Sequence, residues 1–472
     1  MKITAQIFIF SVLVSHATFA AIYDIGESRD YISPNELYTA NVVADGDTIF
    51  IDAEDYVGNN ALAVWSQNNL FIQGTGGRPH LIADGAAIWG KGIWVFAGND
   101  ISVDNIEFSG ATVPDKNGAG IRLDGIGLTA TNCYFHNNEN GILTNNSYEG
   151  VITIEHCEFG GNGFSDGYSH NLYIGHVQKL VFQFNYSHHA KIGHCLKSRA
   201  AENIIQYNRI MDETTGSSSR LIDIPNGGYT ILMGNIIMQG PNAENVNSIG
   251  YGLEGLEANE IHKMLFINNT LISKRGVNAT FFQIQDGTEE VYIANNIFGG
   301  EGSVNAPSFA KLENNIIEQD IESLLLIDEV NFDYNLNSNS PSVDAGKSID
   351  PIDGNELTPL FSYLHNIDNI QRPESGSSID IGAYEFEFVT SAIDESLRND
   401  IIVFPNPAKL EFRISGIDLD FVTISLLDCA GNKIRDINPT EPIDIADLKA
   451  GVYYVKQTKK GVTNSSKLLI VD

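Results

Sequence analysis

The sequence predicts an all-β protein: a right-handed parallel β-helix followed by a small β-sandwich at the C-terminus. Short β-rich runs bounded by Gly, Asn and Asp fill the middle of the chain, and no long stripe of helical period separates them. Among these runs a tetrad of the form Asn-x-x-apolar, or a close relative, recurs at steps of about 25 residues, which is typical of one solenoid turn with loops of variable length. Alternating strands after residue 400 predict the β-sandwich.

The repeated tetrad predicts a ladder of side chains along the coils. The clearest copies occupy residues 105–108, 132–135 and 156–159, and looser copies start at Asn185, Asn208, Asn235, Asn269, Asn296 and Asn315. Asn tolerates left-handed backbone at a turn, and its amide can bond the Asn of the next coil. Cys133 and Cys157 lie one step apart in one column. They could form a disulfide, but a ladder of small buried thiols is favoured, because free Cys is among the most buried residue types.

Both ends of the solenoid need covers, because only stacked coils satisfy each other's edges. We expect residues 21–60 to cover the first coil, which opens at Asp45-Gly46-Asp47-Thr48. The repeat fades after Asn315. The following segment, residues 340–386, contains Arg372-Pro373 and the run from Asp380 to Glu385. It resembles the segment that closes many secreted bacterial β-helix proteins.

Composition and charge limit the possible partners. The chain carries 28 basic and 60 acidic residues, a formal net charge of −32. This excludes nucleic acid as an expected partner, because phosphate binding needs clustered Lys and Arg. Residues 1–20 have the basic start, apolar core and small-residue end of a signal peptide, and no other apolar run is long enough to span a membrane. We therefore expect an extracellular monomer: signal peptide 1–20, β-helix domain 21–386, linker 387–400 and C-terminal domain 401–472.

The C-terminal domain has a recognisable pattern. It opens with Phe404-Pro405-Asn406-Pro407, turns at Gly431-Asn432, continues with Gly451-Val452-Tyr453-Tyr454-Val455, and ends in a strand at residues 468–471. As a set these features resemble the C-terminal sorting domain of the type IX secretion system in Bacteroidetes. The resemblance implies the type IX secretion machinery as a partner, and a secreted or cell-surface location. A carbohydrate-binding module is the alternative, but the sequence offers no exposed aromatic platform to favour it.

One stretch of the solenoid differs from the rest. Residues 170–174, 194–199, 220–224 and 248–251 align as one strand on four successive coils, and one parity of this alignment is mostly apolar. The opposite parity predicts an outward column of Tyr173, Lys197, Asp223 and Tyr251. Arg199 follows two residues after Lys197. His170, His194 and Arg220 form a column at the N-terminal ends of the aligned strands. Coils lie about 4.8 Å apart, so one sugar unit can reach neighbouring members.

The side chains of this face suit β-elimination at a uronic acid. Between His188 and Arg220, five Lys or Arg residues stand against three acidic residues, which is unusual in so acidic a chain. β-Elimination requires a cation to neutralise the C6 carboxylate, a base for the C5 proton, and an acid for the departing O4. Lys and Arg can neutralise, an unprotonated Lys or a tyrosinate can act as base, and Tyr or His can supply the proton.

A family resemblance agrees with this chemistry. The runs Leu196-Lys197-Ser198-Arg199, Tyr207-Asn208-Arg209 and Met233-Gly234-Asn235 resemble the Lys-Ser region of the β-helical polysaccharide lyases of family 6, which act on alginate and dermatan-type polymers. The resemblance places Lys197 at the position of the family's catalytic base, and leaves Arg220 as the one candidate for its catalytic Arg. The acidic residues with which that family holds calcium are missing from residues 190–195. A calcium-free Tyr/Lys arrangement is similar to the β-helical alginate lyases of family 31, with Tyr168, Tyr173 or Tyr251 as the tyrosine.

The sequence therefore predicts a polysaccharide lyase that cleaves an acidic, uronate-containing polymer, with alginate first, and uses neither a metal nor another cofactor. Lys197 is the expected base or carboxylate neutraliser, and Tyr173 the expected acid. The expected substrate-binding residues are Arg199, Arg220, His170, His194, Asp223, Tyr251, His189 and Asn171, with Asp223 also orienting Lys197. Two alternatives stay open: a non-catalytic surface adhesin, and a glycoside hydrolase, which needs two carboxylates. The available carboxylates are Asp212, Glu213, Asp223, Glu254 and Glu257, of which only Asp223 lies on the outward column.

Overall fold

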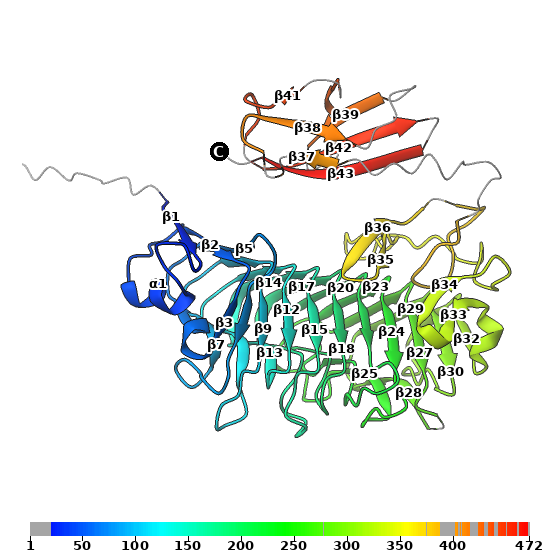
Figure 1. The fold of residues 1–472 in the computed structure, drawn as a ribbon. Helices are drawn as coiled ribbons and strands as arrows, with labels where there is room; N and C mark the ends of the chain where they lie inside the picture. The colour runs from blue at the N-terminus through cyan, green and yellow to red at the C-terminus, as the bar shows by residue number, and fades with distance from the viewer. Residues whose placement is uncertain are drawn as a thin grey trace, which may run out of the picture. The chain divides into compact units, whose positions relative to one another are not determined.

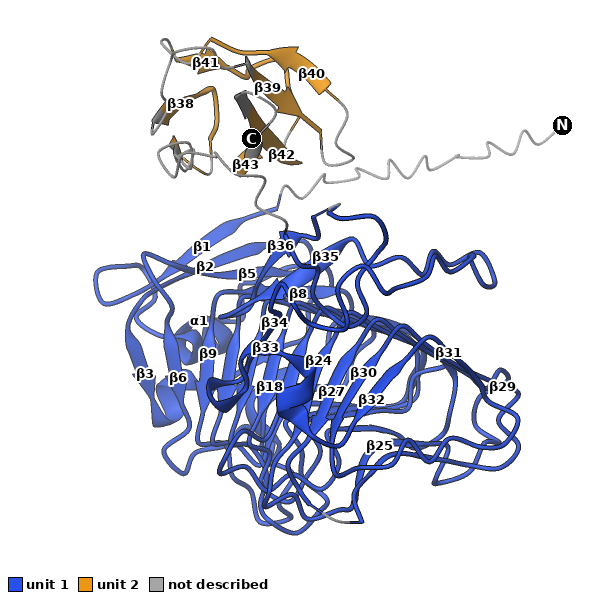
Figure 2. Cartoon of the chain, turned by 90° about the vertical axis from the view of Figure 1, so that its right-hand side faces the viewer, with its two compact units in different colours: residues 1–387 blue, residues 388–472 orange. Residues whose placement is uncertain are grey.

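In the computed structural model the chain forms two compact units, residues 1–387 and 388–472 (Figure 2). The structure describes residues 20–276, 278–373 and 375–387 of the first unit. Of the second unit it describes residues 402–404, 406, 408–415, 423–428, 433–438, 442–449, 451–459 and 462–470. Except for residues 20 and 387, the predicted signal peptide and linker lie outside the described residues. Among the described residues, no helix is long and apolar enough to cross a membrane.

The first unit is a parallel β-helix, as predicted, in which three sheets run along the solenoid (Figure 1). Sheet A contains β1 (Ile22–Ile25), β2 (Thr48–Asp52), β5 (Phe71–Thr75), β8 (Ile101–Asp104), β11 (Leu128–Thr131), β14 (Ser147–Glu155), β17 (Val177–Gln183), β20 (Glu202–Gln206), β23 (Tyr229–Met233), β26 (Lys263–Ile267), β29 (Glu290–Ala294) and β31 (Lys311–Glu313). Sheet B contains β3 (Asp55–Val57), β6 (His80–Ile82), β9 (Glu107–Ser109), β12 (Tyr134–His136), β15 (Glu158–Gly160), β18 (Tyr186–His188), β21 (Arg209–Met211), β24 (Ile236–Gln239), β27 (Thr270–Ser273), β30 (Ile297–Gly300) and β32 (Ile316–Glu318). Sheet C contains β4 (Ala63–Trp65), β7 (Gly92–Phe96), β10 (Ala119–Leu123), β13 (Asn140–Thr144), β16 (Leu172–Ile174), β19 (Leu196–Ser198), β22 (Ile222–Ile224), β25 (Asn247–Tyr251) and β28 (Thr280–Ile284).

The repeated tetrad combines two neighbouring columns at the corner between sheets A and B. In the first column Asn105, Asn132 and His156 adopt left-handed backbone, with φ of 58°, 55° and 54°. The second column, one residue later, points into the core. It holds Ile106, Cys133 and Cys157, then Asn185, Asn208, Asn235, Asn269, Asn296 and Asn315. The predicted Asn ladder is therefore present from Asn185 onward. In the first three tetrads the first residue lies one position before the ladder, in the left-handed column, so the prediction was wrong by one residue there.

The inward column is held together by its amides. From Asn185 to Asn315 each side-chain amide donates to the Oδ1 of the next Asn, at 2.9–3.2 Å. Towards the N-terminus the column continues as thiols, where Cys133 and Cys157 are buried and unpaired. Their backbone contact, with Cys133 N 3.4 Å from Cys157 Sγ, is that of stacked thiols and not of a disulfide.

Separate segments cover the N-terminal end, part of the outward face of sheet B and one corner of the solenoid. At the N-terminal end, helix α1 (Pro34–Ala40) begins at the cap residue Ser33 and buries Leu37, while β1 adds a strand to sheet A and η1 (Gly58–Ala61) follows β3. After the last coil come η2 (Ile321–Leu324), β33 (Leu326–Asp328), η3 (Glu329–Asn331) and β34 (Asp333–Leu336), which pack on the outward face of sheet B, where Leu324, Tyr334 and Leu336 share a cluster with Met238 and Ile272. The hairpin of β35 (Phe361–Leu364) and β36 (Asp368–Gln371) reaches back along the left-handed corner, where Phe361 packs against Phe184 and Tyr207.

The predicted closing segment is held by a buried guanidinium. Arg372 lies 2.9 Å from Glu385 and donates to the carbonyls of Asp380, Gly382, Ala383 and Tyr384. Asn268, in the left-handed column, donates to the Asp380 carbonyl at 2.9 Å. The Arg-Pro and Asp-to-Glu motifs therefore fix this segment to the corner of the solenoid.

The second unit consists of two antiparallel sheets. One contains β37 (Ile402–Phe404), β38 (Glu411–Ser415) and β41 (Ile443–Asp444). The other contains β39 (Thr423–Leu427), β40 (Lys433–Asp436), β42 (Gly451–Lys459) and β43 (Val462–Ile470). Their inward residues, among them Phe412, Leu426, Val455 and Leu468, form a core separate from that of the solenoid. The predicted Gly431-Asn432 turn lies outside the described residues.

Candidate active site on sheet C

The outward face of sheet C carries a cavity of about 490 Å³ over β16, β19 and β22. Tyr173 pairs with Lys197, and Lys197 with Asp223, so three members of the predicted outward column lie side by side. The alternate residues of these strands, including Leu172 and Leu196, are fully buried, as the apolar parity requires. The cavity is lined by Asp166, Gly167, Tyr168, His170, Tyr173, His194, Lys197, Arg199, Ser219, Arg220, Asp223 and Glu254.

Lys197 and Arg199 together bind one carboxylate, that of Glu254. Lys197 Nζ lies 2.7 Å from Oε1 of Glu254, and Arg199 Nη2 lies 2.5 Å from Oε2. Burial raises the pKa of Glu254, but hydrogen bonds and charge from the two cations outweigh it and hold the pKa below its ordinary value. Glu254 follows β25 in a loop, and it entered the sequence prediction only as a possible hydrolase carboxylate. No periodic signal could have placed it here.

Arg199 also positions the tyrosine. Its Nε donates to the Tyr173 hydroxyl at 2.8 Å, and its Nη1 donates to Asn226 Oδ1. Because the Tyr173 oxygen accepts this bond, its own proton stays available to the cavity. The ammonium of Lys197 and the guanidinium of Arg199 lie 5.8 and 5.7 Å from the centre of the Tyr173 ring. The phenol therefore faces the same space as the two cations.

His170 and His194 form a stacked pair at the strand entrance. Their ring centroids are 4.8 Å apart at an interplanar angle of 7°. His170 Nδ1 accepts the backbone N–H of His194, and His194 Nδ1 accepts that of Arg220. These bonds place the ring proton of each histidine on Nε2. Burial, helped by positive neighbours, lowers the pKa of His194 to about 4 and that of His170 well below its ordinary value. Both rings are therefore neutral hydrogen-bond donors near pH 7.

Asp223 connects the remaining polar groups of the cavity. Its carboxylate lies 3.7 Å from Lys197 Nζ, 3.5 Å from His194 Nε2 and 3.4 Å from Arg220 Nη1. The next residue in the column is Gly250, where a Cβ would come within 2.6 Å of Asp223 Oδ1. The missing side chain at Gly250 thus leaves room for Asp223 and Arg220. Arg220 then reaches Gln283 on the following coil, at 3.1 Å.

Three predicted substrate-binding residues do not face this cavity. Tyr251 is buried and donates to the Gly228 carbonyl, because β25 pairs one residue away from the predicted alignment. Asn171 is also buried, and its amide donates to the His188 carbonyl at 2.8 Å. His189 follows β18 of sheet B, with its Nδ1 2.7 Å from that of His188. The first two are structural residues of the solenoid, and the third belongs to another face.

The predicted cation-rich strip divides between faces. Lys197, Arg199 and Arg220 line the cavity, whereas Lys191 and Arg209 do not. Against the three cations stand the carboxylates of Asp166, Asp223 and Glu254, so the cavity is balanced on a formal count and not strongly basic.

A second hollow, of about 530 Å³, lies beside sheet A. It holds Glu202, Lys263 and Asp353, and Lys263 is paired with both Asp353 and Glu290, at 2.7 and 3.2 Å. The lining of this hollow has one cation, Lys263, against two carboxylates, whereas the lining of the sheet C cavity is balanced in formal charge. The sheet C cavity is therefore the better candidate for a polyanion.

Comparisons with known proteins agree with this architecture. A family model described as a right handed beta helix region matches residues 32–168, and a model of the secretion system C-terminal sorting domain matches residues 402–471. The chain is therefore a right-handed parallel β-helix protein with a type IX sorting domain. This domain makes it a secreted or cell-surface protein.

Two individual proteins extend the comparison. An endo-acting ulvan lyase of Formosa agariphila is 38% identical over 87 residues, which is 17% of this chain and 17% of that protein. The chain thus matches about a sixth of the length of this curated relative. The crystal structure of the pectate lyase Pel9A aligns with a TM-score of 0.51 over 78% of this chain and 97% of the other, at 15% identity. At this identity the structural likeness shows the fold alone.

Proposed function

We propose that the protein is a polysaccharide lyase that cleaves a uronate-containing polymer by β-elimination in the sheet C cavity. Alginate is the first candidate substrate, and pectate and ulvan are the next, because the two similar proteins are named as lyases of those polymers. One observation carries the proposal: Lys197 and Arg199 hold the two oxygens of a single carboxylate beside the Tyr173 hydroxyl. A C6 carboxylate in place of Glu254 would meet the same two cations.

The reaction can be assigned to the cavity's own side chains. With the C6 carboxylate neutralised, the C5 proton becomes removable. The base is either Lys197 as the free amine, with Arg199 alone neutralising the carboxylate, or the Tyr173 tyrosinate, with Lys197 and Arg199 both neutralising it. As this base takes the C5 proton, the C5–H electron pair forms the C4–C5 double bond and the C4–O4 bond breaks, with its electron pair leaving on O4. Tyr173 then protonates the leaving oxygen. The neutral Nε2–H groups of His170 and His194 are donors for sugar hydroxyl or carboxylate oxygens, since neither ring has a free acceptor nitrogen for base catalysis.

A glycoside hydrolase is the second candidate, because Asp223 and Glu254 face the same cavity on either side of Lys197. Hydrolysis requires one carboxyl group that is protonated near neutral pH and acts as general acid. The pKa of Glu254 is lowered, which disfavours that role. Both carboxylates are also paired with cations, so the arrangement favours the lyase.

The test uses the full-length protein and a panel of polymers: alginate, pectate, ulvan, hyaluronan and heparin. A lyase produces an unsaturated uronate whose double bond absorbs in the ultraviolet. We expect the absorbance to rise with at least one uronate polymer. Fully methyl-esterified pectin is the matched control, because it keeps the backbone of pectate and lacks the carboxylate charge that Lys197 and Arg199 would bind. New reducing ends without absorbance would establish the hydrolase instead. The absence of both signals would favour the adhesin.

A further inference from the structure

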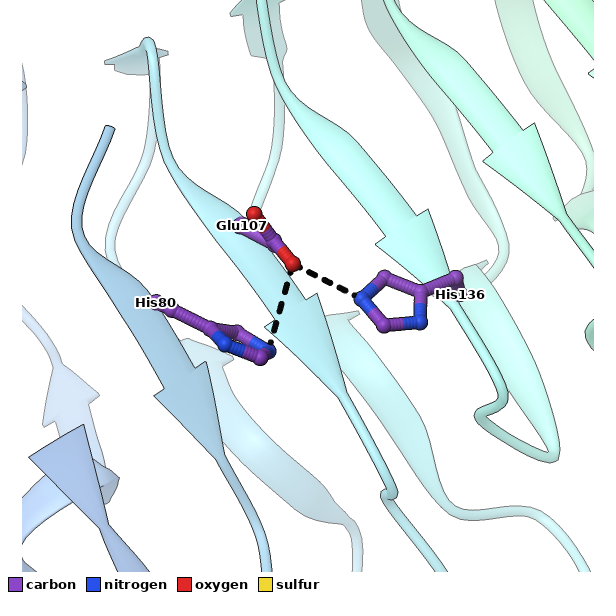
Figure 3. A group of neighbouring side chains, drawn as sticks. All are labelled: His80, Glu107 and His136. Carbon is purple, nitrogen blue, oxygen red and sulfur yellow. Dashed lines mark hydrogen bonds and ion pairs between the residues drawn. The ribbon is translucent and has the colours of Figure 1, made fainter. Parts of the chain in front are cut away.

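A second cluster of chemically active side chains lies on sheet B, away from the sheet C cavity. His80 on β6, Glu107 on β9 and His136 on β12 project from three successive coils on the outward face (Figure 3). His80 and Glu107 are direct partners in the register, whereas His136 pairs with Ser109, two residues beyond Glu107. The two imidazoles approach the same carboxylate from opposite sides, as Figure 3 shows.

The three donor atoms converge. Oε1 of Glu107 lies 2.9 Å from Nε2 of His136 and 3.4 Å from Nε2 of His80. Zinc in proteins binds imidazole nitrogen at about 2.0–2.1 Å and carboxylate oxygen at about 2.0–2.2 Å, so tetrahedral ligands stand on the order of 3.4 Å apart. The side chains therefore approach the spacing of a three-ligand site without any movement of the backbone. Two histidines and one carboxylate, with one position left for water, form a known zinc ligand set.

The surroundings hold the ligands in place. The Tyr134 ring stacks on that of His136, with centroids 4.4 Å apart, and Nδ1 of His136 lies 3.0 Å from the Asn137 amide. Asp55 Oδ1 lies 3.7 Å from Nδ1 of His80, the position from which outer carboxylates orient metal-binding histidines. The His80, Glu107 and His136 side chains are 24%, 24% and 18% exposed, so an ion and a water ligand could enter from solvent.

Other neighbours define the competing interactions. Ser109 Oγ lies 2.7 Å from Nε2 of His80, and the positive charge of Arg78 acts on Glu107. A plain hydrogen-bonded network is the alternative, in which Glu107 is shared between two histidines without an ion.

We propose that His80, Glu107 and His136 bind one divalent transition-metal ion of the zinc class, with water completing its coordination. Imidazole nitrogens suit Zn²⁺, Co²⁺, Ni²⁺ and Cu²⁺, whereas Ca²⁺ and Mg²⁺ prefer all-oxygen sites. The ion would join three adjacent coils through their side chains, near the N-terminal end of the solenoid. It takes no part in the proposed β-elimination, because its ligands lie on a different sheet from Lys197 and Tyr173.

The test uses the full-length protein, stripped with a chelator and dialysed. Titration with Co²⁺ followed by visible absorption should give the spectrum of a low-coordinate site with nitrogen ligands, saturating at one ion per chain. Zn²⁺ should displace this signal and raise the thermal midpoint of the stripped protein. Glu107→Gln, which keeps the shape of the side chain, and His136→Gln should each weaken binding by about tenfold or more.

Two matched variants separate a site from nonspecific binding. His176→Gln removes a histidine from outside the cluster and should leave the Co²⁺ titration unchanged. Ser109→Ala removes the hydroxyl that competes for His80 and should leave binding unchanged or strengthen it. The proposal is overturned if the stripped protein shows no saturable Co²⁺ or Zn²⁺ binding. It is equally overturned if Glu107→Gln and His136→Gln, with unchanged circular dichroism, bind the ions as tightly as the unsubstituted chain.

Discussion

At the scale of single residues, the position of Lys197 distinguishes two chemical roles. Its ammonium is hydrogen-bonded to Glu254 at 2.7 Å and faces Asp223 at 3.7 Å. As a neutraliser of the substrate carboxylate, Lys197 needs only its charge and reach. As the base for C5, it needs an amine that can give up its proton and take another. Arg supplies the first property and not the second, since its guanidinium stays protonated in proteins.

The variants Lys197→Arg and Lys197→Met therefore test the role. We expect Lys197→Met to lose at least about a hundredfold in kcat/KM with the active polymer, as is typical when a charged or proton-transferring group is removed. Lys197→Arg should retain a measurable part of the activity if Lys197 neutralises, and should be as inactive as Lys197→Met if it is the base. Lys191→Met is the control, because Lys191 is exposed and lies outside the cavity. Full activity of Lys197→Met would contradict the site assignment.

Tyr173 provides a separate test of the acid. Removal of its hydroxyl in Tyr173→Phe keeps the ring against His170, whose centroid lies 5.6 Å away. We expect kcat to fall by about 10²–10⁴-fold, the usual contribution of a general acid, with a much smaller change in KM. Initial rates of ultraviolet absorbance across substrate concentrations measure both parameters. Tyr148→Phe, on the exposed side of β14, should behave like the unsubstituted protein. A change confined to KM would instead assign Tyr173 to binding.

The buried histidine pair should make stability depend on pH. The folded pKa of His194 is about 4, against about 6.5 in an unfolded chain. The unfolded state therefore binds more protons between these values, so the stabilisation is complete above pH 6.5 and is lost as the pH falls towards 4. The difference corresponds to about 3 kcal/mol, and His170 shifts in the same direction. The thermal midpoint should fall from pH 6.5 to 5, and less steeply in His194→Gln. An equal slope in that variant would contradict this linkage.

At the scale of elements, strand register decides which parts of the site the sequence could predict. Parity and equal spacing placed Tyr173, Lys197 and Asp223 in one outward column, because each strand has the same two-residue alternation. The prediction for Tyr251 was wrong by a single residue. Ser248 had been aligned with Arg220, whereas Ile222 pairs with Ile249, and a one-residue slip turns every side chain to the other face. Glu254 lies in a loop, where no periodicity exists and tertiary contacts alone set the path.

The two corner columns make different demands on the same residue type. Asn235 is fully buried, donates to the Ile205 carbonyl at 2.8 Å, and accepts from both the backbone and the amide of Asn208. Asn132, in the left-handed column, has a φ of 55°, is exposed, and donates from its side-chain amide to Asp104. Substitution by Gly should therefore have opposite consequences at the two positions.

We expect Asn235→Gly to lower the free energy of unfolding by about 3 kcal/mol or more, because several buried backbone and amide groups lose their partners. Asn132→Gly should cost less than about 1 kcal/mol, since Gly adopts left-handed backbone without steric strain. Chemical denaturation followed by circular dichroism compares the two variants, provided the sorting domain's transition is separated. An equal loss of unfolding free energy in the two variants would show that Asn235 and Asn132 contribute equally to stability, against this prediction.

At the scale of the whole molecule, the two units have separate cores. The solenoid buries an apolar column along its length, while the sorting domain buries its own set around Phe412, Leu426 and Val455. The cavity residues and the proposed metal ligands all belong to residues 80–254. The proposed active site and the sorting domain are therefore carried by different units. The sequence could indicate this division, because the repeat of about 25 residues ends well before the alternating strands of the C-terminal domain begin.

Removal of residues 388–472 should separate catalysis from export. The truncated chain keeps every coil, the cavity residues and the buried Arg372–Glu385 pair. Because no group that would contact the reacting atoms is lost, we expect kcat and KM on the active polymer to stay within about twofold of the full-length values. In a host with the type IX secretion machinery, the full-length protein should reach the medium or cell surface, and the truncated chain should remain inside the cell. Immunoblots of cell, surface and medium fractions measure the distribution. If the truncated chain is exported as efficiently as the full-length protein, the solenoid carries its own export signal. If the truncated chain is retained but inactive, the sorting domain supports the fold of the active site.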